Sequence, residues 1–278
     1  MKTKRLLLAA TIAAMTAACG GAKQESSKVL VLYYSQTGNT KMVAEEIANR
    51  LGADIEAIEC VNPYDGDFQS TIERCMQERE QQLKPVIQPI QADLSKYDVI
   101  FLGYPVWFGT YAPPVDTWLT STDLSGKKIV PFCTFGSGGL ESSVKDLVDD
   151  QPNAEVLAGY GVRAARLDAM PAEVDQFLKA NGFVEGEYVK LPDFPEQHEV
   201  SAEETTVFDA AVDGYPMLHA QAKAVATRTL PDGVEYLFTA LDTQYNIVAS
   251  DTTPTEIPIQ VYVTVLNGAA PVFTRVVR

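Results

Sequence analysis

The sequence predicts an α/β protein whose main domain is a doubly wound, five-stranded parallel sheet, followed by a small α+β domain with an antiparallel sheet. From residue 28 to about residue 184, short apolar runs alternate with segments of helical periodicity, which is typical of a parallel sheet with helices on both faces. The apolar runs are continuous, as expected for strands buried on both faces. Beyond a proline-rich stretch at residues 189–200, apolar residues alternate with polar ones, which indicates strands with one exposed face.

Strand-length and helix-length segments follow one another in the first part of the chain. The predicted strands are residues 28–34 (KVLVLYY), 54–59 (DIEAIE), 97–107 (YDVIFLGYPVW), 127–135 (KKIVPFCTF) and 154–162 (AEVLAGYGV). The predicted helices are residues 41–51, 69–83, 139–150 and 171–182. Gly52 supplies a stop for the first helix, and Pro171 stands at the start of the last one.

The C-terminal part of the chain predicts a different unit. A short amphipathic helix is expected at residues 207–218, and residues 233–241 (GVEYLFTAL) and 258–266 (PIQVYVTVL) each place their large apolar side chains on one face. The predicted boundaries are a signal segment with a lipobox at residues 1–19, a tether at 20–27, the α/β domain at 28–188, a linker at 189–200 and the α+β domain at 201–278.

The N-terminal residues predict export. The basic head MKTKR precedes an apolar stretch at residues 6–18, which is shorter than the ~20 residues of a membrane-spanning helix and is typical of a cleaved secretory signal. Cys19 follows two alanines and resembles the lipidated cysteine of bacterial lipoproteins, although Thr16 stands where those signals usually carry leucine. We therefore expect lipidation at Cys19 and a place in the cell envelope, periplasm-facing or on the surface. An ordinary secreted protein with an unmodified cysteine is the alternative.

Composition argues against several classes of function. The formal net charge of −15 at pH 7 disfavours nucleic acids and anionic membranes as partners, so we expect membrane contact only through the lipid. The three cysteines beyond Cys19 allow at most one disulfide, and with His198 and His219 as the only histidines there is no plausible Cys/His metal site. The stretch TFGSGG lacks the first glycine of a GxSxG motif, which disfavours a serine hydrolase.

A small, nearly uncharged loop follows the first predicted strand. The stretch YYSQTGNTK at residues 33–41 lies at the carboxyl end of that strand, where open parallel sheets bind their ligands. The helix after it begins with unpaired N–H groups and a partial positive charge, and Gly38 permits close approach. Short side chains add further donors: Ser35, Thr37, Asn39 and Thr40. The loop predicts a cup of neutral donors for a phosphate, with a simple helix cap as the alternative.

Two more loops lie at the same predicted edge. Pro105 precedes adjacent aromatic residues in GYPVWFG, and the stretch CTFGSGG opens another helix with small residues. A phosphate cup, an aromatic wall and a flexible backbone with exposed N–H and C=O groups suit a phosphorylated, flat, heteroaromatic ligand. Trp107 and Phe108 could equally be core or interface aromatics.

Three stretches together closely resemble flavodoxins and the flavodoxin-like FMN proteins of bacteria: VLYYSQTGNTKMVAEEIANRL, YDVIFLGYPVWFG and GKKIVPFCTFGSGG. The resemblance covers residues 28–184 and implies a five-stranded sheet of order 2-1-3-4-5 with FMN as cofactor. It implies phosphate binding by the first loop, contact with the flavin ring by the second, with Trp107 stacking, and backbone contacts to the ring's polar edge by the third. The implied cofactor-binding residues are Ser35, Gln36, Thr37, Gly38, Asn39, Thr40, Pro105, Val106, Trp107, Phe108, Gly109, Thr134, Phe135, Gly136, Ser137, Gly138 and Gly139.

The resemblance implies a flavin-dependent electron carrier or oxidoreductase that needs no catalytic side chain, since the cofactor carries the redox chemistry. No nicotinamide-binding domain is recognisable, so we expect exchange with a redox partner protein or a quinone-like acceptor. The acidic surface should lower the potential of the second one-electron step, and the glycine-rich third loop should permit a peptide flip toward the ring. A binding module that kept the fold without cofactor is the competing class.

The C-terminal domain resembles cystatins in its order of helix, strand pair meeting at Gly233, and closing hairpin near Asn267 and Gly268. Residues 229–233 (TLPDG) replace the Gln-x-Val-x-Gly loop of inhibitory cystatins, and Leu266 and Asn267 replace their Pro-Trp tip. We therefore expect a docking module or structural cover rather than a peptidase inhibitor.

Overall fold

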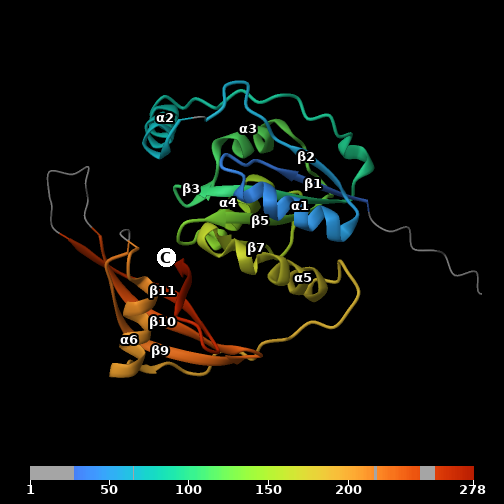
Figure 1. Ribbon diagram of the computed structural model, residues 1–278. Helices are drawn as coiled ribbons and strands as arrows, with labels where there is room; N and C mark the ends of the chain where they lie inside the picture. Colours follow the sequence, from blue (N-terminus) through green and yellow to red (C-terminus); the bar gives the residue numbers. More distant parts are fainter. Residues whose placement is uncertain (1–27, 65, 216–217, 245–253) are drawn as a thin grey trace, which may run out of the picture.

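The computed structural model describes residues 28–64, 66–215, 218–244 and 254–278. The predicted signal and tether at residues 1–27, including Cys19, lie outside the described residues. Within the described ranges no helix has the length and hydropathy needed to cross a membrane. Two sheets with separate hydrophobic cores make up this part of the chain (Figure 1).

The first sheet confirms the predicted parallel architecture. Its five main positions follow the order β2-β1-β3-β5-β6, which is the implied order 2-1-3-4-5, with β7 also pairing with β5 and the short β4 forming a hairpin with β3. The strands are β1 Val29–Tyr33, β2 Asp54–Ala57, β3 Val99–Trp107, β4 Thr110–Tyr111, β5 Lys128–Phe135, β6 Glu155–Val156 and β7 Tyr160–Arg163. Parallel neighbours bring the carboxyl ends of β1, β3 and β5 to one edge.

Helices cover both faces of this sheet, which explains the continuous apolar runs. Alternate residues of β1 enter different cores: Leu30 packs in the core that α3 and α4 cover, and Val31 in the core that α1 and α5 cover. The helices are α1 Asn39–Leu51, α2 Phe68–Glu80, α3 Pro113–Ser121, α4 Leu140–Asp150 and α5 Met170–Ala180, with 3-10 turns at Leu94–Lys96 and Ala164–Ala169. Helix α3 was not predicted, although the proline pair at its first positions is a helix-start signal.

The fifth predicted strand, residues 154–162, is broken in two. Val156 of β6 lies opposite Ile129, whereas Tyr160 of β7 lies opposite Phe132, so this strand has one residue more than β5 over the same span. Pro131 lies in the middle of that span and has no N–H to donate to the ladder. A β-carbon on Gly159 would lie 2.9 Å from the Pro131 ring, so only glycine fits this close crossing. A bulge therefore replaces the continuous strand.

The second sheet is antiparallel, as predicted, in the order β12-β11-β10-β9-β8. Its strands are β8 His198–Glu199, β9 Ala220–Leu230, β10 Gly233–Gln244, β11 Thr255–Leu266 and β12 Val272–Val277. Tight turns join β9 to β10 at Gly233 and β11 to β12 at residues 267–271, in agreement with the predicted hairpins. The resemblance of this unit to cystatins stays a prediction.

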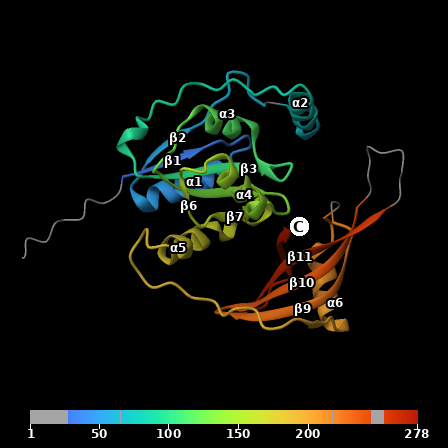
Figure 2. The same ribbon diagram turned by 180° about the vertical axis from the view of Figure 1, so that it is seen from behind.

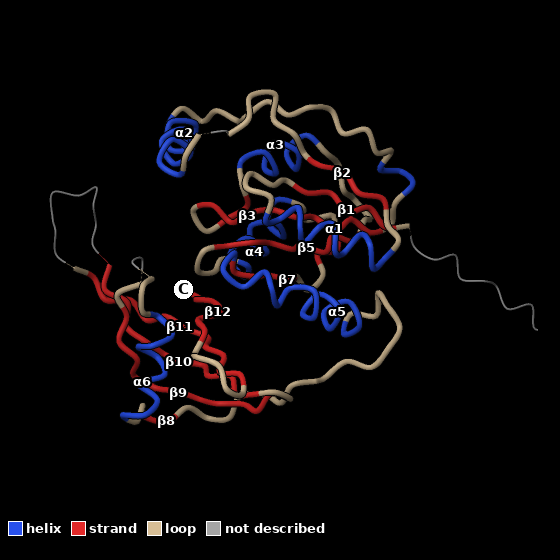
Figure 3. The backbone as a smooth tube through the Cα atoms, in the orientation of Figure 1, coloured by secondary structure: helices blue, strands red, loops and turns tan. Residues whose placement is uncertain are grey.

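The helix of the second unit begins earlier than predicted. Helix α6 spans Ala202–Val212, whereas the apolar pattern suggested residues 207–218. A capping box explains the difference, because the Ser201 hydroxyl accepts from the Glu204 amide while the Glu204 carboxylate accepts from the Ser201 amide. Helix α6 lies along one face of this sheet (Figure 3). Its Phe208 packs against Phe238 in the core of this unit.

The two units meet at the edge strand β12. The end of this strand lies beside the carboxyl ends of β3 and β5, and the C-terminal end of the chain lies between the two units in both views (Figures 1 and 2). The amide of Val276 donates to the carbonyl of Ser137 at 2.6 Å, which joins β12 to the loop after β5.

Candidate functional site

The three loops predicted to bind the ligand come together in the structure. The hydroxyls of Thr40 and Thr134 are buried, lie 2.8 Å apart and share a hydrogen bond, which joins the first loop to the third. A β-carbon on Gly139 would lie 2.5 Å from Cγ1 of Val106, so the third loop also packs closely on the second. Strand pairing therefore brings loops about 100 positions apart in sequence to one edge of the sheet, where the sequence predicts them.

The first loop offers unused donors at the start of α1. Gly38 is the N-cap residue with φ of +89°, and no side chain caps the helix. The first amide bonded within the helix belongs to Met42, which donates to the Gly38 carbonyl at 3.0 Å, so the amides of the preceding turn point outward without helical partners. Among the described residues, the Ser35 hydroxyl is one of two buried side-chain groups without a hydrogen-bond partner; the other is the Thr110 hydroxyl. These observations disfavour the reading of the loop as a simple helix cap.

Not every polar side chain of this loop is available to a ligand. The Gln36 amide donates to the Tyr64 carbonyl at 2.9 Å and to the Thr71 hydroxyl at 2.8 Å, which ties the loop to α2. Thr37 is exposed and Asn39 is half-buried, while Thr40 is bonded to Thr134. Gln36 and Thr40 thus position the loop, and Ser35, Thr37 and the backbone amides are left for binding.

The second loop presents two aromatic residues in different settings. Trp107 is half-buried, and its ring packs edge-on against Tyr34, with centroids 5.9 Å apart, and against Tyr64, at 5.2 Å. Phe108 lies at the tip of the β3–β4 hairpin, is 51% exposed, and has a left-handed backbone with φ of +52°. A bulky residue is uncommon in that conformation, so the hairpin holds Phe108 outward at a cost in backbone strain.

The third loop is held more firmly than the sequence predicts. The carbonyl of Gly136 accepts from Arg163 at 2.8 Å, and the carbonyl of Ser137 accepts from the Val276 amide. A β-carbon on Gly138 would lie 2.0 Å from the Val276 carbonyl oxygen. The backbone predicted to be flexible is therefore held by Arg163 at the end of β7 and by Val276 of the second sheet. Sequence patterns did not predict that the second sheet contacts this loop.

A cavity of about 900 Å³ lies beside the second and third loops, and Gln36 is the residue of the first loop that lines it. Its volume is near the upper end of the ~300–1,000 Å³ typical of small-molecule sites. Residues of the second and third loops, of α2 and of the second sheet line it. From the first unit these include Gln36, Phe68, Ile72, Cys75, Val106, Trp107, Phe108, Gly136, Ser137, Gly138 and Gly139.

The cysteine that lines the cavity is not activated as a nucleophile. Cys75 lines the cavity, and burial raises the pKa of its thiol to about 11, so it is a neutral thiol at pH 7. No cluster of three or more His, Cys, Asp or Glu residues that could hold a metal ion occurs in the described part of the chain.

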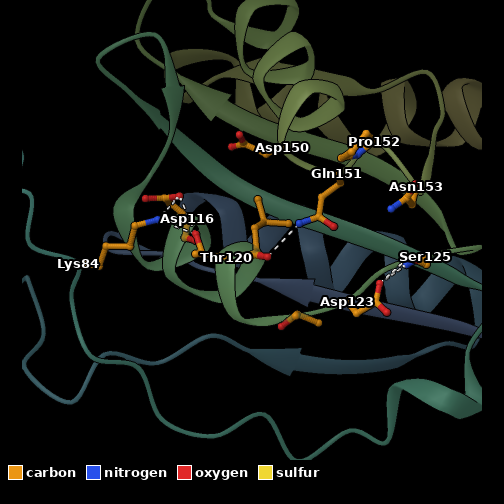
Figure 4. A pocket seen from close by; sticks show the side chains of 11 residues that line it. Lys84, Asp116, Thr120, Asp123, Ser125, Asp150, Gln151, Pro152 and Asn153 are labelled. Atoms are coloured by element: carbon orange, nitrogen blue, oxygen red, sulfur yellow. Dashed lines mark hydrogen bonds and ion pairs between the residues drawn. The ribbon is translucent and has the colours of Figure 1, made fainter.

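A second hollow, of about 440 Å³, lies at the opposite edge of the first sheet, where α3 and α4 end (Figure 4). Its polar groups bond to one another: the Lys84 ammonium contacts the carboxylate of Asp116 at 2.9 Å, and the Ser125 hydroxyl donates to Asp123 at 2.5 Å. Because these groups already bond to one another, fewer of them are left to bind a ligand than in the first loop. The cavity at the carboxyl ends of the strands is therefore the candidate site.

Comparisons with known proteins concern the first unit. Residues 28–170 match a family model described as Flavodoxin, which is more than half of the chain. A candidate flavoprotein from Bacteroides eggerthii is 30% identical, with 54% of this chain and 96% of that chain covered and a TM-score of 0.47. A flavoprotein from Lactobacillus acidophilus in complex with FMN is 25% identical, with 54% and 97% covered and a TM-score of 0.46. No curated protein matches the chain.

Proposed function

The chain belongs to the flavodoxin family through residues 28–170, and from this premise we propose that it binds FMN and exchanges electrons through it. The observation that carries the proposal is the first loop, where the buried Ser35 hydroxyl lacks a partner beside the open start of α1. Neutral donors at a helix N-terminus are suited to a phosphate dianion.

In this proposal, different parts of the chain bind the phosphate and the ring of the cofactor. The Ser35 and Thr37 hydroxyls and the first amides of α1 would hold the phosphate, with hydrogen bonds to a charged group worth about 1.5–3 kcal/mol each. The ring would lie in the cavity beside Trp107 and Phe108, with the third loop at its polar edge. The rigid aromatic cluster around Trp107 keeps that wall in place before the ligand arrives.

FMN, when bound, supplies the one- and two-electron chemistry. The neutral Cys75 thiol, with its raised pKa, fits a site in which the protein positions the cofactor and excludes water rather than attacking a substrate. The electron acceptor in this proposal is a redox partner protein or a quinone-like molecule. Lipidation at Cys19 would keep the exchange in the cell envelope.

A binding module without cofactor is the second candidate, favoured only by the firm attachment of the third loop to β12. Such a module gains nothing from a partnerless buried hydroxyl, because leaving a buried polar group unpaired costs about 1–3 kcal/mol. The unpaired Ser35 therefore favours the cofactor-binding function.

The test measures the affinity of three cofactor-free proteins for FMN: wild type, Ser35→Ala and Ser121→Ala. Quenching of flavin fluorescence on titration reports binding. Ser35→Ala should weaken FMN binding about tenfold through the loss of one hydrogen bond to the phosphate. Ser121 bonds only to carbonyls of its own helix and serves as the matched control, with no expected change. Equal affinity in all three proteins would contradict the phosphate site.

A further inference from the structure

The cavity beside the cofactor loops has a second wall that belongs to the C-terminal unit. Its lining continues from the first unit onto the segment after α6, the end of β10 and the end of β12. These lining residues are Tyr215, His219, Asp242, Thr243, Val276, Val277 and Arg278. The cofactor loops thus form only one side of a cavity that two units enclose.

The contact between the two walls is specific at the level of the backbone. Val276 forms a parallel bridge with Gly138, and its amide donates to Ser137 at 2.6 Å. Any side chain at Gly138 would collide with the Val276 carbonyl, so glycine is required there by the docking of β12.

Charged side chains hold the same contact. Arg163 donates to the carbonyl of Gly136 at 2.8 Å and to the carbonyl of Phe273 at 2.5 Å, with its guanidinium 4.1 Å from the centre of the Phe273 ring. Arg275 of β12 lies 3.5 Å from Glu141 at the start of α4. Burying a guanidinium without hydrogen-bond partners would be costly, and Arg163 has partners in both units. This favours a fixed position of β12 against the third loop.

The chemistry of the lining indicates what the cavity takes. Its walls carry aromatic and aliphatic side chains from both units, among them Trp107, Tyr215 and Val277, which suit a flat apolar molecule. Its charges are matched within the protein, since Arg278 lies 3.6 Å from the buried carboxylate of Asp242 and Glu141 pairs with Arg275. A cavity with paired charges favours an uncharged ligand over an anion.

We propose that the C-terminal unit forms a binding subsite for a flat, uncharged aromatic carbonyl compound of the quinone class beside the cofactor. This inference rests on the proposed function and names a small molecule, rather than a protein, as the electron acceptor. With FMN bound and reduced, the cofactor would supply two electrons and two protons, and the carbonyl compound held in the subsite would take them up to become its dihydroxy form.

The test is binding of 1,4-naphthoquinone to the FMN-loaded full chain, with FMN affinity measured in parallel. Val277→Trp fills the cavity from β12, and Thr243→Trp fills it from β10. If one of the two variants misfolds, the other still tests the subsite. Val272→Trp on the same strand, at a 40% exposed position outside the cavity, is the matched control.

We expect both cavity variants to bind naphthoquinone at least about tenfold more weakly while FMN affinity stays within about twofold, and Val272→Trp to match wild type. Wild type should bind the anionic 1,4-naphthoquinone-2-sulfonate more weakly than the parent compound. Unchanged naphthoquinone affinity in both cavity variants would overturn the subsite, as would loss of FMN itself in both. Preference for the sulfonate would overturn the uncharged class. Failure of wild type to bind FMN would instead overturn the proposed function.

Discussion

The two sheets of this protein bury their strands in different ways. In the parallel sheet, consecutive residues of β3 such as Phe101 and Leu102 are both fully buried, each in a different core. In the antiparallel sheet, Ile259 of β11 is buried while the next residue, Gln260, is exposed. Both faces of the first sheet are therefore covered by helices, and its loops remain for binding. The second sheet contacts the first unit through its edge strand β12.

The largest expected effect tests this difference directly. Phe101→Ala and Leu102→Ala should each lower the free energy of unfolding of the first unit by about 2–5 kcal/mol, because neither neighbour faces solvent. In the second unit, Ile259→Ala should cost a similar amount, whereas Gln260→Ala should change stability by less than about 0.5 kcal/mol. Denaturant titration of the four variants measures these free energies of unfolding. A loss of several kcal/mol for Gln260→Ala would contradict the difference between the two sheets.

The contact between the units should depend on Arg163. Arg163→Leu removes two hydrogen bonds from a cation and its contact with the Phe273 ring, which together should weaken docking by about 1.5–3 kcal/mol. Limited proteolysis of the segment between α5 and β8 should become faster. Lys145, in an exposed pair with Asp149, is a control whose replacement by leucine should leave the digestion rate unchanged.

Two glycines of the third loop, Gly138 and Gly136, differ in how closely they approach β12. Gly138→Ala should push β12 away, since the new methyl group would lie 2.0 Å from the Val276 carbonyl, whereas Gly136→Ala has an ordinary nearest contact of 3.4 Å. A packing clash of about 1–3 kcal/mol corresponds to roughly 5- to 150-fold faster hydrogen exchange at the Val276 amide. Exchange that is equally slow in both variants would show that β12 does not depend on this close approach.

The smallest expected effect concerns thiols, which all belong to the first unit among the described residues. Burial raises the pKa of Cys60 and of Cys75 from 9.0 to about 11. The folded chain holds these protons more tightly than the unfolded chain, so their contribution to stability is present below pH 9 and is lost as the pH rises toward 11. Iodoacetamide should therefore react more slowly with the native chain than with the urea-unfolded chain at pH 8.5. Equal rates would contradict the shift.

Local sequence patterns predicted what depends on local physics. Strand β1, the small residues before α1 and the alternating residues of β11 were each predicted from their own local pattern. The meeting of the three candidate loops follows from the position of their strand ends at one edge of the sheet. The break between β6 and β7 depends on Pro131 in the neighbouring strand. The clamp from Val276 to Ser137 joins residues that no periodicity relates. Such features arise from long-range packing, which composition and spacing do not encode.

Calorimetry of the cofactor-free full chain with FMN and with riboflavin tests most directly whether the first loop is a phosphate site. The two ligands share the ring and differ in the phosphate, so the free-energy difference between them isolates the donors at the start of α1. FMN should bind with micromolar or tighter affinity and riboflavin at least about tenfold more weakly. Equal affinities, or no heat with FMN at several temperatures, would contradict the phosphate site.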